Sequence, residues 1–169
     1  MSNPAPTLEH PVLDDFRRAM RRVASGVALV TTGDADGNRF GIAMTAFMSL
    51  SFDPPSLVIA VNRSASVHKP LLVNRAFCVN VLSESQEALC QDFVSRASHD
   101  RFAAGEWLDD DRGIPYLPGA LSNIFCAIES HQSSGSHDVI VGVASRVVNH
   151  DEIAPLIFVN GRYGAMAGA

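Results

Sequence analysis

Short apolar runs of strand length recur along the chain, and they do not alternate regularly with helical segments. Most are rich in β-branched and aromatic residues, which favour strands. The runs occupy residues 27–32, 40–45, 57–62, 77–82, 122–130, 138–148 and 156–159. A parallel sheet needs a long crossover between neighbouring strands, whereas antiparallel strands need only a turn. The pattern therefore predicts a mainly β protein, an antiparallel barrel with peripheral helices.

Two segments carry helical spacing instead. Phe16 and Met20 lie one turn apart and predict a helix over residues 14–26, capped by an aspartate and stopped by a glycine. A second helix is predicted over residues 83–97, because a Ser-x-x-Gln capping box opens it and apolar residues then share one face. The residues that follow, 98–117, include three consecutive aspartates at 109–111, Gly113 and Pro115, so we expect a long surface loop there.

Length and charge narrow the class of protein. With 169 residues, 47% of them hydrophobic, the chain suits a single domain, residues 13–169, after a flexible N-terminal arm, residues 1–12. A net charge of −5 gives no indication of nucleic-acid or anionic-membrane binding. No run reaches the ~20 residues of a membrane-spanning helix, and the N-terminus lacks a secretory-signal pattern. We expect a cytoplasmic protein whose three cysteines are reduced.

A polar block, residues 41–66, holds the most specific chemistry. Residues 62–66 read Asn-Arg-Ser-Ala-Ser, and Lys69 follows, so a guanidinium, two hydroxyls and several backbone amides come directly after a strand. Groups of these kinds hold terminal phosphates. The chain has neither a Gly-x-Gly-x-x-Gly motif nor a Walker loop, so any phosphate must be held in another way. Because the hydroxyls of residues 45–51 match the polar edge of a heterocycle, the block predicts a phosphorylated planar ligand.

Each part of this block also has a purely structural interpretation. Residues 62–66 can be a polar turn in which Ser66 caps the next short helix. The serines and threonine of residues 45–51 can be ordinary exposed strand residues, and Phe47 and Leu50 can belong to the core. The residue types alone leave these alternatives open.

Several motifs, taken together and in order, resemble the flavin reductase-like family. They are Phe-Arg-x-x-Met at 16–20, Ala-Ser-Gly-Val at 24–27, the block 41–66, Phe-Cys-Val-Asn-Val-Leu at 77–82, Asp-Arg-Phe at 100–102, Gly-Ser-His at 135–137 and Gly-Arg-Tyr at 161–163. The resemblance covers most of residues 14–166. It implies an FMN-binding split β-barrel, a homodimer, bound FMN or FAD, and NADH or NADPH as the hydride donor.

The same resemblance implies roles for individual residues. Those expected to border the flavin ring are Thr45, Ala46, Phe47, Ser49 and Ser51. Those expected to hold the ribityl chain and phosphate are Asn62, Arg63, Ser64, Ser66 and Lys69. Phe102 and Tyr163 are expected near the flavin or the nicotinamide. His137 is the candidate catalytic residue, because an imidazole can orient the nicotinamide or exchange a proton near neutral pH.

The chain departs from the family pattern at two places. Many relatives carry Gly-Asp-His followed by Thr, whereas this chain has Gly-Ser-His-Asp at residues 135–138, so the acidic partner is rearranged around His137. Ala43 stands where a Thr is frequent, which removes one possible hydroxyl contact to the ring. His131 precedes His137 by six residues, but no further ligands at metal-type spacing accompany the pair, so no metal site is predicted.

Three functions fit this sequence. The first is an NAD(P)H:flavin oxidoreductase that supplies reduced flavin to a partner monooxygenase. The second is a reductase of the same fold that retains FMN and reduces another acceptor, such as the cobalt of a corrinoid in cobalamin assembly. The third is a non-catalytic flavin-binding protein. Hydride transfer between two cofactors needs the protein mainly to position two rings, so the sequence need not show a strong acid or nucleophile.

Overall fold

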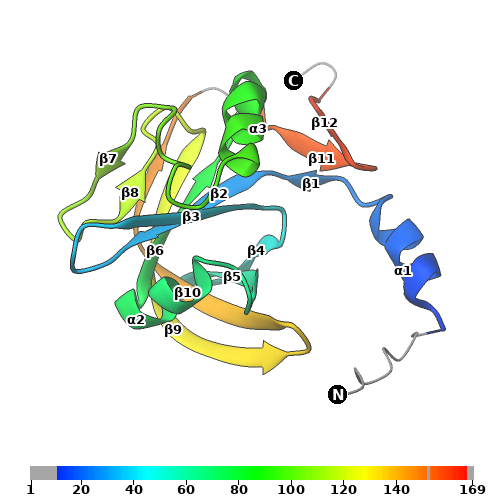
Figure 1. Ribbon diagram of the computed structural model, residues 1–169, viewed down its shortest axis with the longest axis horizontal. Helices are drawn as coiled ribbons and strands as arrows, with labels where there is room; N and C mark the ends of the chain where they lie inside the picture. Colours follow the sequence, from blue (N-terminus) through cyan, green and yellow to red (C-terminus); the bar gives the residue numbers. More distant parts are fainter. Residues whose placement is uncertain (1–10, 152, 167–169) are drawn as a thin grey trace, which may run out of the picture.

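A seven-stranded antiparallel sheet forms the body of the protein in this computed structural model, which describes residues 11–151 and 153–166. The strand order is β3-β2-β6-β9-β10-β5-β4 (Figure 1). The strands are β2 (Ala28–Gly33), β3 (Arg39–Met44), β4 (Phe47–Phe52), β5 (Pro55–Asn62), β6 (Ala76–Val81), β9 (Ser122–Ser134) and β10 (His137–Asn149). The mainly β antiparallel fold that the sequence predicted is therefore confirmed.

The two edge strands of this sheet are consecutive in the chain. β3 ends at Met44 and β4 begins at Phe47, so only Thr45 and Ala46 join them. A flat seven-stranded sheet would hold its edges roughly 29 Å apart at about 4.8 Å per strand interval. Three residue steps span at most about 11 Å. The sheet must therefore curl until its edges meet, and the result is a barrel that stays split between β3 and β4.

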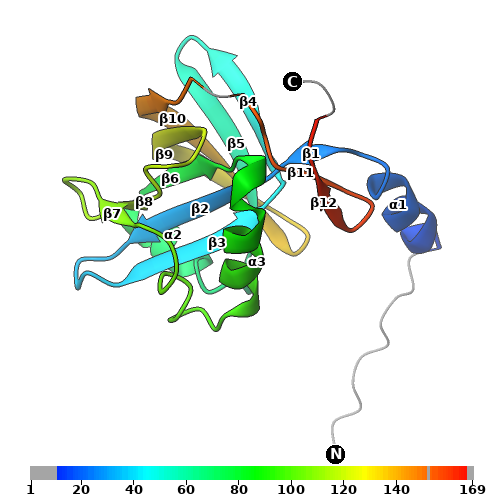
Figure 2. The same ribbon diagram turned by 90° about the horizontal axis from the view of Figure 1, so that it is seen from above.

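In the described part of the chain, three α-helices lie outside the barrel. They are α1 (Leu13–Met20), α2 (His68–Asn74) and α3 (Glu87–Ser95), the last preceded by a 3-10 turn, η1 (Glu84–Gln86). The predicted capping box is present, with Ser83 and Gln86 bonded reciprocally. α2 and α3 contact the barrel, whereas α1 stands apart from it at the end of an extended segment (Figures 1 and 2). The aspartates expected to cap α1 lie instead inside its first turn, because the helix begins at Leu13.

Two small sheets complete the fold. β1 (Ser25–Gly26), β11 (Ile157–Val159) and β12 (Arg162–Gly164) form one beside α1, and β7 (Leu108–Asp109) pairs with β8 (Pro115–Tyr116) in the other. The first helix was predicted to continue to residue 26, which is wrong, because residues 25 and 26 pair with β11. The predicted loop over residues 98–117 is likewise interrupted by β7 and β8. The predicted arm, residues 1–12, falls largely outside the described residues, so the division into an arm and one domain stays a prediction.

A buried asparagine fastens the long loop to the barrel. The Asn80 side chain on β6 is fully buried, and its amide nitrogen donates to the Leu29 carbonyl at 2.8 Å and to the Thr31 hydroxyl at 3.1 Å. Its amide oxygen accepts from the Leu117 backbone N–H at 2.8 Å and from the Asn123 side chain at 2.9 Å. These four bonds satisfy the whole amide, so the polar group is tolerated inside an apolar core.

The described part of the chain has no helix long and apolar enough to cross a membrane. Residues 1–10, 152 and 167–169 lie outside that statement.

Replacing Asn80 with Ala should lower the free energy of unfolding by roughly 3 kcal/mol, because it leaves buried donors and acceptors on three segments without partners. Urea denaturation measures the loss. The matched control is Asn149→Ala, since Asn149 is exposed and accepts one hydrogen bond, from Ser122. We expect the control to cost about 0.5 kcal/mol or less. Equal losses in the two variants would contradict this role for Asn80.

Candidate flavin site

The register of β5 and β10 brings two predicted site segments together. His137, the first residue of β10, pairs with Asn62, the last residue of β5. Beyond this pair, the Arg63 backbone N–H donates to the Ser136 carbonyl at 3.0 Å, and its guanidinium donates to the Gly135 carbonyl at 2.7 Å. The turn at residues 62–66, which we call the phosphate turn, therefore lies against the turn that carries His137.

Asn62 shapes the phosphate turn from within. Its side-chain oxygen accepts from the backbone N–H of Ser64 at 2.9 Å and from the Ser64 hydroxyl at 2.8 Å, while its carbonyl accepts from the Ala65 N–H. Among the described residues, no side-chain hydrogen bond or ion pair engages Ser66 or Lys69, and both are exposed. The turn thus offers a hydroxyl and a guanidinium to solvent, donors suited to phosphate, and Lys69 follows on α2, where it lines a separate hollow with Asp34 and Asn74.

Thr45 and Ala46 lie at the same end of the barrel. The Ala46 carbonyl accepts from the Ala60 N–H at 3.0 Å, which places Thr45 near the end of β5 that leads into the phosphate turn. β5 lies between β4 and β10. Thr45 and His137 therefore flank the phosphate turn on opposite sides, as a ligand bound across it would require.

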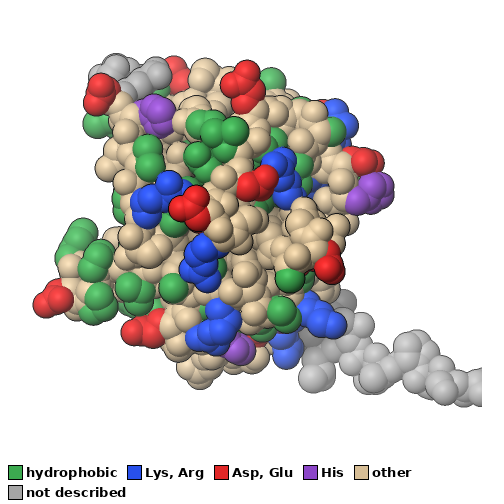
Figure 3. Space-filling view, turned by 90° about the vertical axis from the view of Figure 1, so that its left-hand side faces the viewer, with side chains coloured by type: hydrophobic (Ala, Val, Ile, Leu, Met, Phe, Trp, Pro, Cys, Tyr) green, Lys and Arg blue, Asp and Glu red, His purple; other side chains and the backbone are tan. Residues whose placement is uncertain are grey.

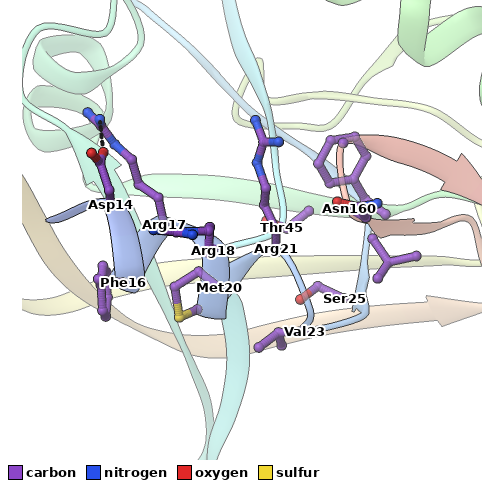
Figure 4. A pocket seen from close by; sticks show the side chains of 13 residues that line it. Asp14, Phe16, Arg17, Arg18, Met20, Arg21, Val23, Ser25, Thr45 and Asn160 are labelled. Atoms are coloured by element: carbon purple, nitrogen blue, oxygen red, sulfur yellow. Dashed lines mark hydrogen bonds and ion pairs between the residues drawn. The ribbon is translucent and has the colours of Figure 1, made fainter. Parts of the chain in front are cut away.

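Thr45 opens onto two hollows. The larger, about 690 Å³, lies between α1 and the turn that joins β11 to β12. Figure 4 shows that Arg17 and Arg21 extend away from Phe16 and Met20 in this hollow. The smaller, about 220 Å³, is lined by residues that include Thr45 and Tyr163. Space for a planar ligand and a second ring is therefore present beside Thr45.

Tyr163 and Phe102 occupy different surroundings. Tyr163 packs on Phe158 with ring centroids 5.2 Å apart, its hydroxyl lies 3.6 Å from the Cys90 sulfur, and partial burial raises its pKa to about 12. Phe102 packs against Phe93 and Trp107, with its ring centroid 4.8 Å from that of Trp107. Phe102 lines neither hollow that contains Thr45. Of these two aromatic residues, therefore, Tyr163 alone lies beside Thr45, which is predicted to border the flavin ring.

Three other predicted ring contacts lie along β4. Phe47 is half-buried and packs against the main core, as the structural interpretation held. Ser49 pairs with Leu57, five residues before Asn62 and roughly 16 Å from it along the strand. The Ser51 hydroxyl accepts from the Asp53 N–H at 3.0 Å and donates to the Asp53 carbonyl at 3.1 Å. The structure does not gather Ser49 and Ser51 with the phosphate turn, and their contact with the ring stays a prediction.

Asp138 and His68 form a pair that sequence reasoning missed. Asp138 is buried, and its carboxylate contacts the His68 imidazole at 2.8 Å and accepts from the Ser133 hydroxyl at 2.7 Å. The Ser133 hydrogen bond and then the His68 contact lower the pKa of Asp138 below its ordinary value. An aspartate at an inward position of an alternating strand indicates that a buried partner exists. The sequence does not show that this partner is His68, because the two residues are 70 positions apart.

The cysteines show no sign of nucleophilic chemistry. All three are free and buried, and burial raises the pKa of each thiol, that of Cys126 to about 12. A thiolate is the reactive form, so these side chains act as small apolar residues. No group of three or more His, Cys, Asp or Glu residues in the described ranges is arranged to hold a metal ion.

Charge is mixed on the side of the barrel that carries β7, β8 and α2. Figure 3 shows acidic and basic side chains interspersed over this face, without a continuous patch of one sign. An anion would therefore be attracted on this side by local groups rather than by a broad basic surface.

Residues 20–167 match the model of the flavin reductase like domain, and the chain belongs to that family. It is similar to an FMN reductase (NADH) RutF of Methylorubrum populi, with 37% identity over 155 residues, which are 91% of this chain and 76% of that protein. Among solved structures, it resembles the NADH:FAD oxidoreductase SgcE6 of Streptomyces globisporus in complex with NAD and FAD fragments, at 27% identity and a TM-score of 0.86, covering 96% and 98% of the two chains. It also resembles nitrilotriacetate monooxygenase component B of Mycobacterium thermoresistibile, at 31% identity and a TM-score of 0.85, covering 91% and 86%.

Proposed function

We propose that the protein is an NADH-dependent flavin oxidoreductase that reduces FMN and supplies it to a partner monooxygenase. The observation that carries this proposal is the exposed phosphate turn held against the His137 turn, with Thr45 on its other side. The relatives named FMN reductase (NADH) support FMN and NADH as the pair of cofactors. The flavin reductase of a styrene monooxygenase, which is among its structural neighbours, supports delivery of the reduced flavin. The buried, free cysteines are compatible with work in the cytoplasm.

The residues divide the work between binding and positioning. Arg63, Ser66 and Lys69 hold the phosphate with charge-assisted hydrogen bonds, while Asn62 and Ser64, which bond to each other, set the shape of the turn. Thr45 and the backbone of Ala46 border the flavin ring, and Tyr163 closes the hollow beside them. A bound flavin accepts the hydride of NADH, so the protein has only to hold the two rings face to face and exclude water.

His137 is well placed to act on the nicotinamide or on a proton at the ring. Its imidazole is exposed on β10, and its Nδ1 lies 2.9 Å from the Ser136 hydroxyl, which orients the ring. The neighbouring Asp138 faces inward and is engaged by His68, so the acidic partner of relatives is replaced at His137 by a neutral hydroxyl. An imidazole can both donate and accept hydrogen bonds, so it suits either role.

Replacing His137 with Ala should slow NADH-dependent FMN reduction by about ten- to a hundredfold and change the FMN dissociation constant by less than about threefold. Anaerobic stopped-flow measurement of flavin bleaching gives the rate, and fluorescence titration gives the affinity. The matched control is His150→Ala, since His150 is exposed and has no proposed role. Unchanged reduction in His137→Ala would remove this residue from the mechanism. Failure of the wild type to bind FMN at micromolar concentration would reject the whole function.

The fate of the electrons separates the proposal from its alternatives. Reduced protein mixed anaerobically with free FMN, FAD or a cobalt corrinoid reveals which acceptor is reduced. Rapid exchange with free flavin supports delivery to a monooxygenase, whereas tight retention of one FMN and reduction of the corrinoid would support the second function. Bound flavin that NADH does not bleach would indicate a non-catalytic flavin-binding protein.

We further propose that the protein works as a homodimer, with α1 in the interface. α1 buries none of its side chains against the rest of the described chain, and Phe16 and Met20 are 59% and 50% exposed. On the barrel edge, Leu50 and Phe52 of β4 are exposed as well. An amphipathic helix with an uncovered apolar face needs a partner surface, and an edge strand with outward apolar residues is a second such surface.

The double variant Phe16→Asp/Met20→Asp should be monomeric, because it places two charges in the apolar face of α1. Light scattering coupled to size-exclusion chromatography measures the mass. Val73→Asp is the matched control, since Val73 is 73% exposed on α2, away from α1. A double variant that remains dimeric, or a control that dissociates equally, would contradict an interface through α1.

A further inference from the structure

Asp138 is a buried carboxylate with a defined set of partners. It is 3% exposed, and its Oδ1 accepts from the Ser133 hydroxyl, its neighbour across the β9–β10 pair. Its Oδ2 lies 2.8 Å from His68 Nε2 and 3.7 Å from His131 Nδ1. A carboxylate removed from water is costly unless it is paired and hydrogen-bonded, so Asp138 requires these partners to stay in place.

The Asp138–His68 contact joins the phosphate turn to the turn that carries His137, on the buried side of both turns. Asp138 directly follows His137 on β10, and His68 is the first residue of α2, two positions after Ser66. The outer side of the same junction is held by the two hydrogen bonds from Arg63. The phosphate turn is therefore fastened to β10 from both sides, and the inner fastening is the buried one.

We propose that Asp138, acting through His68, is a positioning residue that fixes the phosphate turn and so gives the site its preference for phosphorylated flavins over riboflavin. This inference rests on the proposed function. Side-chain donors bind phosphate well only when the turn that carries them is held in place before the ligand arrives, because ordering it on binding costs conformational entropy. Asp138 contacts the His68 imidazole from the buried side. His68 is the first residue of α2, so this contact fixes the position at which the phosphate turn ends and α2 begins.

The alternative is a purely structural role in the barrel. Asp138 lies on the β9–β10 hairpin, so its loss could weaken the whole fold and every ligand equally. Riboflavin distinguishes the two roles, since it carries the flavin ring and ribityl chain of FMN without the phosphate. A general loss of structure weakens both ligands, whereas a misplaced phosphate turn weakens FMN alone.

The experiment titrates wild type, Asp138→Asn and His68→Gln with FMN and with riboflavin, following flavin fluorescence. We expect each variant to bind FMN about tenfold more weakly and riboflavin within about twofold of wild type, since each loses a charge-assisted hydrogen bond. The double variant should be no worse than either single one, because both changes break the same contact. Asp109→Asn is the matched control, since it removes a carboxylate that pairs with Arg39 away from these turns.

The outcomes distinguish failure of the positioning role of Asp138 from failure of the proposed flavin reductase function. Equal weakening of FMN and riboflavin, or unchanged FMN binding in both variants, would overturn the positioning role while leaving the flavin reductase function intact. A wild type that binds neither flavin would overturn both. Asp138→Thr, the residue that the family pattern places here, provides a second test, and it should show the same loss confined to FMN.

Discussion

The two-residue link between β3 and β4 is the constraint on which the rest of the fold depends. It joins the opposite edges of a seven-stranded sheet, so the sheet must curl and its edges must meet at Thr45 and Ala46. The seam between β3 and β4 carries no strand pairing. Thr45 therefore lies at an edge without strand pairing, and the two hollows that it lines are there.

The second organising feature is the junction of the phosphate turn with the His137 turn. Strand register alone places Asn62 opposite His137, but it does not fix the exposed residues that follow. Arg63 fastens the turn on the outside, and the buried contact of Asp138 with His68 fastens it on the inside. In this chain a neutral hydroxyl, that of Ser136, lies beside the His137 imidazole, and the negative charge of Asp138 lies at a buried position behind the phosphate turn.

Much of the fold could be predicted from the sequence, because runs rich in β-branched residues mark six of the seven barrel strands. Residues 48–52 of β4 alternate apolar and polar as a strand does, but β4 was not assigned because it has no β-branched residue and its serines were interpreted as ligand contacts. The exposed polar turn at residues 62–66 could also be predicted, since its polar residues are contiguous, whereas its binding of phosphate stays a prediction. The Asp138–His68 contact could not, because its members are 70 residues apart and only the barrel brings them together.

Hydrogen–deuterium exchange with and without FMN tests the central claim most directly, because it reports which backbone amides the ligand protects. If the flavin lies across the closure point with its phosphate in the turn, saturating FMN will slow exchange at residues 45–47, 63–67 and 135–138. Residues 34, 35, 73 and 74, which line a separate hollow that reaches the C-terminal end of α2, should be unaffected. FMN binding without protection at residues 63–67, or with protection confined to that second hollow, would contradict this assignment.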